Sequence, residues 1–194
     1  MSPSLTRPDP AATDAVAPPT QRVFFALWPD DGARDALAAL AHRLARETEG
    51  RAADAGRLHL TLAFIGNVSS SQVTTLVALA RSVAQGAAPF VLPLDRSGMF
   101  RVAGIAWAGT SIIPPLLGRL VSGLRRDLQM HSFEVDRRDY RAHVTLARRC
   151  RRMPASRGEM AAIDWQVHTM TLTASELTVQ GPRYSTLAQW PLSR

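Results

Sequence analysis

Leu58-His59-Leu60-Thr61-Leu62 is the stretch around which the chain is organised, because the same pattern returns later as Ala142-His143-Val144-Thr145-Leu146. Side chains on a strand alternate between its two faces. Each copy, read as a strand, therefore places its histidine and threonine on one face and its aliphatic residues on the other. A single His-x-Thr-Leu is usually chance, but two copies in matching surroundings predict one shared site.

The composition is that of a globular protein with one domain of ordinary size: 194 residues, 46% hydrophobic and 20% charged. No apolar run approaches the roughly 18 residues that a membrane span needs, and the N-terminus lacks the layout of a signal peptide. We therefore expect a cytoplasmic protein. The single cysteine, Cys150, excludes an internal disulfide.

All 23 basic residues are arginine, and the net charge is +7. A guanidinium group matches the oxygens of phosphate, and a basic surface favours polyanionic partners. The densest cluster brackets His143 and contains Arg137, Arg138, Arg141, Arg148, Arg149, Arg151 and Arg152. A charge run of this kind is often only a solvated face, but around a candidate catalytic histidine it indicates a phosphate site.

Residues 1–21 form a Pro/Ala-rich stretch without apolar periodicity, which predicts a disordered tail before a single domain over 22–194. Periodicity and turn residues then predict the elements of the first half. They are a buried strand at 22–28, a helix from Pro29-Asp30-Asp31 to Gly50, a strand at 58–65 ended by Gly66-Asn67, a helix from Ser70 to Val83, and a strand at 89–94.

The second half is expected to follow the same order of elements. They are a turn at Ser97-Gly98, a strand at 102–107, a helix from Pro114-Pro115 to Leu128, a short strand at 132–135, a strand at 140–148, a short helix at 156–162, a strand at 165–179 and, after Gly181-Pro182, a strand at 184–190. His168 is expected to be a structural side chain of the long strand. The matching order of 23–91 and 102–178 predicts a duplication that brings one histidine from each half to a shared groove.

The paired motifs and the opening Arg22-Val23-Phe24-Phe25-Ala26-Leu27-Trp28-Pro29 resemble the 2H phosphoesterases. Within that superfamily the chain is similar to the RNA 2′,3′-cyclic phosphodiesterases, also called 2′-5′ RNA ligases. Gly98-Met99-Phe100-Arg101 before Trp107, and Leu172-Thr173-Ala174-Ser175-Glu176 before Gly181 and Tyr184, extend the likeness to about residues 22–192. Family members commonly have proline before the second histidine, where this chain has Ala142.

The resemblance implies an α+β fold of two pseudo-symmetric lobes, each an antiparallel sheet with helices packed outside, which face each other across a central cleft. It implies that His59 and His143 are the catalytic residues. It also implies that Thr61, Thr145 and Arg148 bind the phosphate.

Phe64, Phe100 and Tyr140 are candidates for stacking on a base, although each is equally well placed to belong to the core. The partner that the resemblance implies is RNA with a 2′,3′-cyclic phosphate end, tRNA fragments among them. We expect a monomer that needs no metal, no other cofactor and no membrane.

Opening a 2′,3′-cyclic phosphate with water requires one group that takes a proton and another that gives one. Histidine, with an ordinary pKa of about 6.5, suits both roles. We assign His143 to the activation of water and His59 to the protonation of the ribose 3′-oxygen, which leaves a 2′-phosphate; the opposite assignment fits the residues as well. The same site run in reverse would join a cyclic end to a 5′-hydroxyl through a 2′-5′ linkage.

Three alternatives remain at this point. In the first alternative, the substrate is another cyclic phosphate or a 2′-5′ oligonucleotide. In the second the chain is a non-catalytic RNA-binding module, against which the intact histidines and threonines of both motifs argue. The third is metal binding by the histidines, against which the lack of a carboxylate or cysteine at ligand spacing argues.

Overall fold

The computed structural model describes residues 20–136, 138–179 and 181–193, so that most of the predicted tail and Arg137 of the arginine cluster lie outside the described residues. The described chain forms three α-helices, one short 3-10 helix and nine strands. In chain order they are β1 Gln21–Leu27, α1 Asp31–Thr48, β2 Arg51–Ala52, η1 Ala55–Arg57, β3 Leu60–Val68, α2 Ser70–Gln85, β4 Phe90–Phe100, β5 Ile105–Gly109, α3 Pro115–Met130, β6 His143–Arg148, β7 Gly158–Val167, β8 Thr169–Thr178 and β9 Gly181–Pro191.

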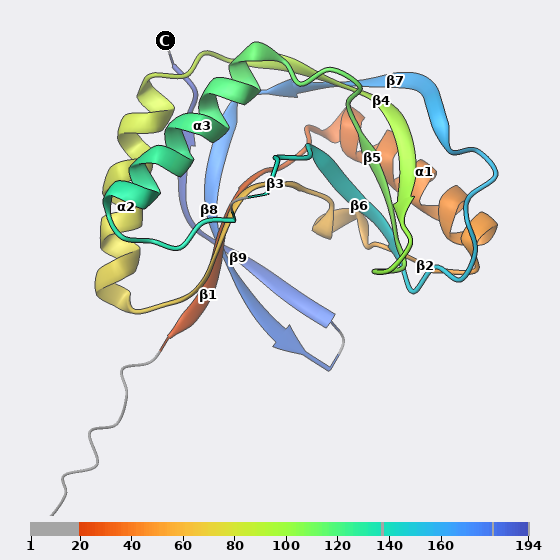
Figure 1. Ribbon diagram of the computed structural model, residues 1–194, viewed down its shortest axis with the longest axis horizontal. Coiled ribbons are helices and arrows are strands. Elements are labelled where there is room, and N and C mark those ends of the chain that lie inside the picture. Colours follow the sequence, from red (N-terminus) through yellow and green to blue (C-terminus); the bar gives the residue numbers. More distant parts are fainter. Residues whose placement is uncertain (1–19, 137, 180, 194) are drawn as a thin grey trace, which may run out of the picture.

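The strands make an antiparallel sheet in the order β7-β4-β5-β6-β3-β1-β8-β9, with β2 paired to β6 (Figure 1). At its centre, β3 and β6 are joined by a single residue pair, Leu60 opposite Val144. This seam divides the sheet into a first lobe, β3-β1-β8-β9, and a second lobe, β7-β4-β5-β6. The predicted α+β fold of two lobes is confirmed.

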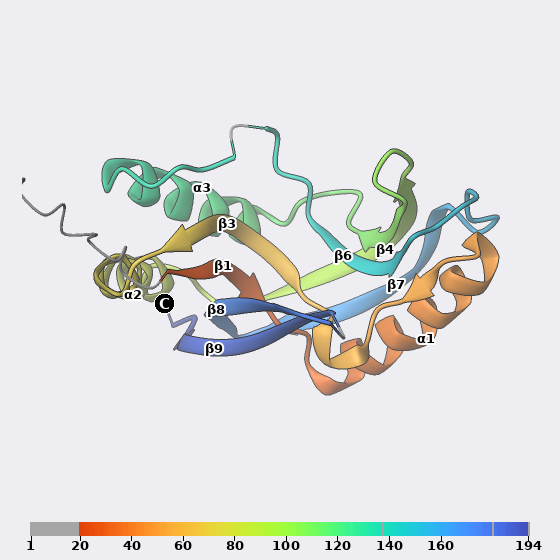
Figure 2. The ribbon, with the colours of Figure 1, turned by 90° about the horizontal axis from the view of Figure 1, so that it is seen from below.

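The helices connect the two lobes as well as covering them. Helix α1 follows β1 of the first lobe but packs against β6 and β7 of the second, whereas α3 follows β5 of the second lobe and packs against β3 and α2 of the first. Figures 1 and 2 show α2 and α3 at one end of the molecule and α1 at the other. The lobes are therefore tied by crossing connections rather than by a flexible linker.

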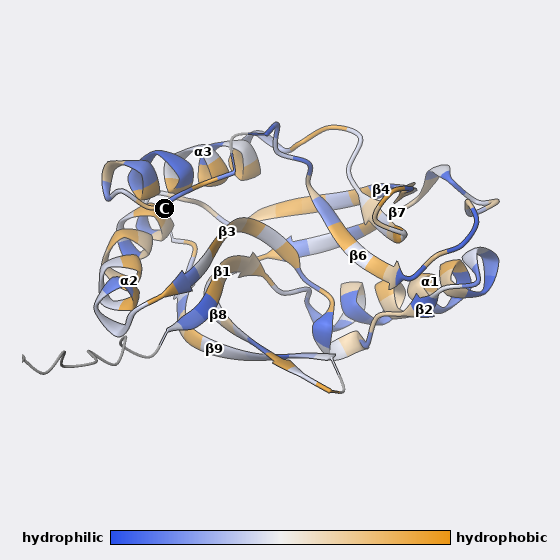
Figure 3. Ribbon diagram, turned by 60° about the horizontal axis from the view of Figure 1, so that its bottom comes forward, coloured by the Kyte–Doolittle hydropathy of each residue, from blue (hydrophilic) through white to orange (hydrophobic). Residues whose placement is uncertain are grey.

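Local sequence sets where each helix begins. The Asp30 side chain accepts a hydrogen bond from the Ala33 amide at 2.9 Å and caps α1. Ser69 and Gln72 form a capping box at the start of α2, and Pro115 is the first residue of α3. Figure 3 shows hydrophobic and hydrophilic residues on different sides of these helices, and the hydrophobic sides pack on the sheet.

Strand β1 is the buried central strand that the sequence predicts, between β3 and β8. Val23, Phe25 and Leu27 are 0% exposed and belong to the core under the helices. The alternate residues point to the other face, where Ala26 lies opposite Thr61 of β3. That second face is the one that the first motif occupies.

The helix predicted at 156–162 is wrong, because β7 begins at Gly158 and pairs with β4. Ile163 lies opposite Leu94 in this ladder, so pairing overrides the helical propensity of Glu-Met-Ala-Ala. The second half thus lacks a counterpart of α2. The single strand predicted at 165–179 is also wrong: it is β7 and β8, which lie in different lobes, and His168 at the junction is exposed rather than part of the packing.

The predicted turn at Ser97-Gly98 is wrong, since β4 continues to Phe100 and the turn comes at 101–104, where Gly104 has a φ of 59°. Gly66 does not end its strand either. It lies in β3 beside an irregularity in the pairing with β1 and takes a φ of 92°. No strand forms at 132–135, all four residues of which are described. Glycine in these strands marks distortion or close packing more often than a turn.

Candidate active site

The two motifs meet at the seam between β3 and β6. Leu60 and Val144, the middle residues of the motifs, lie opposite each other and are both 0% exposed. The histidine and the threonine of each motif flank that motif's residue of the pair, so the four polar residues surround it. All four polar side chains are then on the face opposite the helical packing, as the alternation predicts.

Both histidines are held by the backbone in the same way. Nδ1 of His59 lies 2.7 Å from the carbonyl oxygen of Arg57, and Nδ1 of His143 lies 2.7 Å from that of Arg141. A carbonyl oxygen only accepts, so Nδ1 carries the hydrogen and donates it in both cases. In the neutral ring Nε2 is then the basic nitrogen, and it is the atom left to exchange a proton with a substrate.

Burial lowers the pKa of His59; the hydrogen bond to the Arg57 carbonyl opposes this effect, and the charges of Arg148 and His143 lower the pKa further. The pKa of His143 is lowered by burial and by Arg148, again against its backbone hydrogen bond. The two rings and Arg148 are therefore close enough to interact electrostatically. The family resemblance implies the same three residues.

Three aromatic rings surround His59. Its ring centroid lies 5.0 Å from that of Phe24, 5.0 Å from that of Trp28 and 5.2 Å from that of Tyr184. The Trp28 indole N–H donates to Oγ1 of Thr171 at 2.9 Å, which fixes the indole on the sheet. Sequence reasoning did not assign these rings to the site, although Phe24 and Trp28 alternate along the opening strand on the face of Thr61.

The wall beside His143 has a different composition. Phe100 meets the His143 ring edge-on with 5.0 Å between centroids and stacks on Trp107 at 5.6 Å. The indole of Trp107 lies across Gly98, where a Cβ atom would come within 2.4 Å of it, and against Gly109. The two glycines therefore leave the room that this indole occupies.

The three candidates for base stacking have different surroundings. Phe100 borders His143, as above. Phe64 is 44% exposed, and the guanidinium of Arg22 lies 4.7 Å from its ring centroid. The Tyr140 hydroxyl donates to the carbonyl oxygen of Thr61 at 3.0 Å, and burial raises the pKa of Tyr140 well above its usual range. Tyr140 thus joins the loop before the second motif to the strand of the first.

The arginine cluster is divided between the site and the surface. Arg138 pairs with Asp136 at 2.5 Å, and Arg152 pairs with Glu49 at the end of α1. Arg148, in contrast, acts on both histidines. Within the arginine cluster, Arg148 is the residue whose charge lowers the pKa of both motif histidines.

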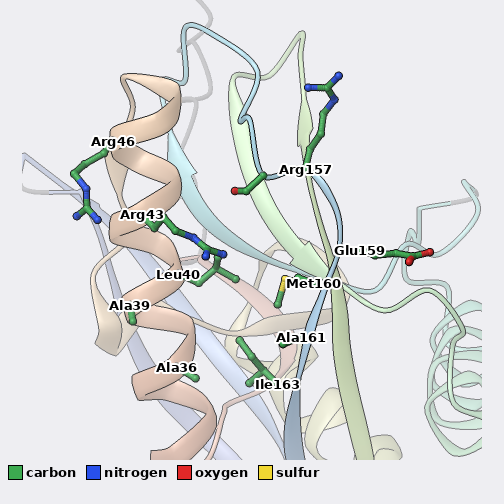
Figure 4. Close-up of a pocket in the computed structure, with 11 residues that line it drawn as sticks. Ala36, Ala39, Leu40, Arg43, Arg46, Arg157, Glu159, Met160, Ala161 and Ile163 are labelled. Atoms are coloured by element: carbon green, nitrogen blue, oxygen red, sulfur yellow. The ribbon is translucent and has the colours of Figure 1, made fainter.

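A hollow of about 680 Å³ lies apart from the motifs, between α1 and β7 (Figure 4). Leu40, Met160 and Ile163 are among its apolar lining residues, and Arg43 reaches in from α1. It contains no residue of either motif. Among the described residues there is no cluster of three or more His, Cys, Asp or Glu side chains suited to a metal ion, and none of the helices is long and apolar enough to cross a membrane.

Comparison with known proteins gives a consistent result. A family model described as LigT like Phosphoesterase matches residues 27–107. A protein of Thermus thermophilus named RNA 2′,3′-cyclic phosphodiesterase is 28% identical over 179 residues, which cover 88% of this chain and 90% of that protein. One of Escherichia coli with the same name is 29% identical over 174 residues, covering 90% and 98%. The crystal structure of E. coli LigT complexed with 3′-AMP superposes with a TM-score of 0.77 at 28% identity and covers 91% of this chain and 100% of that one.

Proposed function

We propose that this chain is a LigT-like phosphoesterase and that it hydrolyses the 2′,3′-cyclic phosphate at an RNA end to a 2′-phosphate. One observation carries the proposal: both motif histidines present Nε2, because both donate Nδ1–H to a backbone carbonyl at 2.7 Å. Such a pair supplies a general base on one side of a phosphate and a general acid on the other.

In the proposed reaction, Nε2 of His143 takes a proton from water as the water oxygen bonds to phosphorus. The bond from phosphorus to the ribose 3′-oxygen breaks, and Nε2–H of His59 gives its proton to that oxygen. The phosphate stays on the 2′-oxygen. The enclosed surroundings of His59 suit the ribose, whereas the more open position of His143 suits the entry of water, which supports this assignment over the opposite one.

The threonines and Arg148 stabilise the charge that develops on the phosphate. Hydroxyl donors from Thr61 and Thr145 and the guanidinium of Arg148 would reach the non-bridging oxygens, where negative charge increases in the transition state. With a 5′-hydroxyl in place of water, the same steps would form a 2′-5′ linkage. Every group comes from one chain, so a monomer suffices, and we place the reaction in the cytoplasm.

The test uses a short oligoribonucleotide with a 2′,3′-cyclic phosphate end, in EDTA, with identification of the product phosphate. Wild type is expected to form a 2′-phosphate. His59→Ala and His143→Ala are each expected to lose about 10²- to 10⁴-fold in kcat. His42→Ala is the matched control, because His42 is exposed on α1 and belongs to neither motif.

Three outcomes would contradict the proposal. A 3′-phosphate product would mean that the other ribose oxygen leaves. No turnover by wild type, together with salt-sensitive binding of the same RNA, would identify a binding module instead of an enzyme. Turnover that appears only when a divalent metal is restored would contradict the metal-free mechanism.

A further inference from the structure

A groove of about 520 Å³ lies beside the active site on the face of β8 and β9. Its floor is a patch of four side chains in register, Thr171 opposite Gln189 and Thr173 opposite Thr186. Its volume is within the range typical of small-ligand sites. None of the catalytic or phosphate-binding residues proposed above lines it.

The groove and the active site share a wall. Trp28 and Tyr184 line the groove, and the same two rings lie 5.0 Å and 5.2 Å from the ring of His59. The hydrogen bond from Trp28 Nε1 to Thr171 Oγ1 at 2.9 Å ties this wall to the floor. A molecule in the groove is therefore one layer of side chains away from a ligand at His59.

The groove and its rim differ in charge. The groove is lined mainly by hydroxyl, amide and aromatic groups, together with the Asp30 carboxylate and the His168 ring, and no arginine belongs to its lining. The charges of Arg22, Arg57 and Arg148, in contrast, all act on the Tyr184 hydroxyl at its edge. In recognition of single-stranded RNA, cationic side chains follow the phosphates, whereas aromatic rings and neutral hydrogen-bonding groups receive the bases.

We propose that this groove binds the nucleobase of the penultimate nucleotide, the one on the 5′ side of the nucleotide that carries the cyclic phosphate. This inference rests on the proposed function. The terminal ribose lies at His59, the next phosphodiester passes the arginines around Tyr184, and the preceding base enters the groove between Trp28, Tyr184 and the threonine floor. The substrate is thus a single-stranded RNA end of at least two nucleotides rather than a mononucleotide or another small cyclic phosphate.

The experiment compares kcat/KM for three substrates: a nucleoside 2′,3′-cyclic phosphate, a dinucleotide ending in a 2′,3′-cyclic phosphate, and the same dinucleotide with an abasic penultimate position. Wild type is expected to favour the full dinucleotide over the mononucleotide by about 10-fold or more, since stacking of one base is worth about 5- to 150-fold. The abasic dinucleotide is expected to lose most of that advantage, because it keeps the phosphodiester but lacks the base.

The variant Thr186→Ala/Gln189→Ala removes two exposed groups of the floor. It is expected to lower the ratio of kcat/KM for the dinucleotide to that for the mononucleotide by about 3- to 30-fold, mainly through a higher KM for the dinucleotide. Ser185→Ala is the control, because Ser185 is exposed on the same strand but outside the groove. It is expected to keep the wild-type ratio.

Each other result overturns the inference in a distinguishable way. Equal kcat/KM for mononucleotide and dinucleotide in wild type would exclude a second base site while leaving the proposed hydrolysis intact. A dinucleotide preference that the double variant retains would place the base elsewhere. Failure of wild type to hydrolyse any of the three would refute the proposed function, and this inference with it.

Discussion

Gly98→Ala tests whether the packing of Phe100 and Trp107 beside His143 depends on the lack of a side chain at position 98 of β4. A Cβ atom at position 98 would lie 2.4, 2.9 and 3.0 Å from three carbons of the Trp107 ring. Ordinary carbon contacts are about 3.5 Å or longer, so the indole would have to retreat by about 1 Å. We expect this overpacking to lower the free energy of unfolding by about 1–3 kcal/mol.

The same shift should reach the chemistry, because Trp107 supports Phe100, and Phe100 contacts the His143 ring. A displacement of about 1 Å at a reacting group costs up to about 10²-fold in rate. We therefore expect kcat/KM for the cyclic phosphate to fall by about 10- to 100-fold. Urea unfolding followed by fluorescence gives the stability, and hydrolysis measured on the folded variant gives the rate.

Two further variants make the result specific. Gly123→Ala, in α3, is the matched control, because its Cβ would meet nothing closer than Val83 at 3.9 Å, and it should stabilise the helix by about 0.5–1 kcal/mol. In a Trp107→Leu background, Gly98→Ala should change the free energy of unfolding and kcat/KM much less than it does in the wild type. Trp107→Leu breaks no side-chain hydrogen bond within the described residues, since Nε1 has no partner there. An unchanged urea midpoint and rate for Gly98→Ala, or an equal cost in both backgrounds, would refute the reasoning.

Two more predictions concern the proton transfers. Arg148→Gln removes a positive charge that lowers the pKa of both His59 and His143, so both pKa values should rise and the bell-shaped pH profile of kcat/KM should move to higher pH. We also expect kcat/KM at the optimum to fall by about 10- to 100-fold. A profile that stays in place or moves to lower pH would contradict this electrostatic role. A substrate with sulfur in place of the ribose 3′-oxygen needs no protonation of its leaving group. It should therefore restore activity to His59→Ala but not to His143→Ala. Rescue of His143→Ala instead would reverse the assignment of acid and base.

The sequence predicts those helices and strands whose two faces differ in polarity. The helical stripes of α1, α2 and α3 and the alternation of the two motifs each have one apolar and one polar side, so periodicity locates them. Periodicity does not predict strand β7, because Glu-Met-Ala-Ala favours a helix and the segment becomes a strand only through its pairing with β4. The sequence pattern does not indicate the break between β7 and β8 at His168 either, because the two strands form one continuous alternation of apolar and polar residues.

The site follows the same division. The histidines and threonines are predicted from a motif, which is local, and their grouping is predicted from its repetition, whereas Arg148 is predicted only from the family resemblance. The rings around His59 are not found, because β1 is apolar on both faces and its periodicity does not show which side chains are core and which line the site. Tyr184 reaches His59 only through the pairing of β1 with β8 and of β8 with β9. The tautomers depend on carbonyl groups two residues before each histidine, which no side-chain pattern encodes.

The short pairing at the seam suits the phosphate binding that we propose for this antiparallel sheet. Residues directly opposite in such a ladder have Cβ atoms about 5 Å apart, so full pairing of β3 with β6 would pack each histidine against the threonine of the other motif. In this chain the ladder consists of the single pair Leu60 and Val144, and no other residues of β3 and β6, all of which are described, pair with each other. The crossing connections through α1 and α3 hold the lobes together without further pairing. The histidines and threonines of the two motifs are thus spared the cross-strand packing that a full ladder would impose, as the proposed mechanism requires of side chains that hold a phosphate between them.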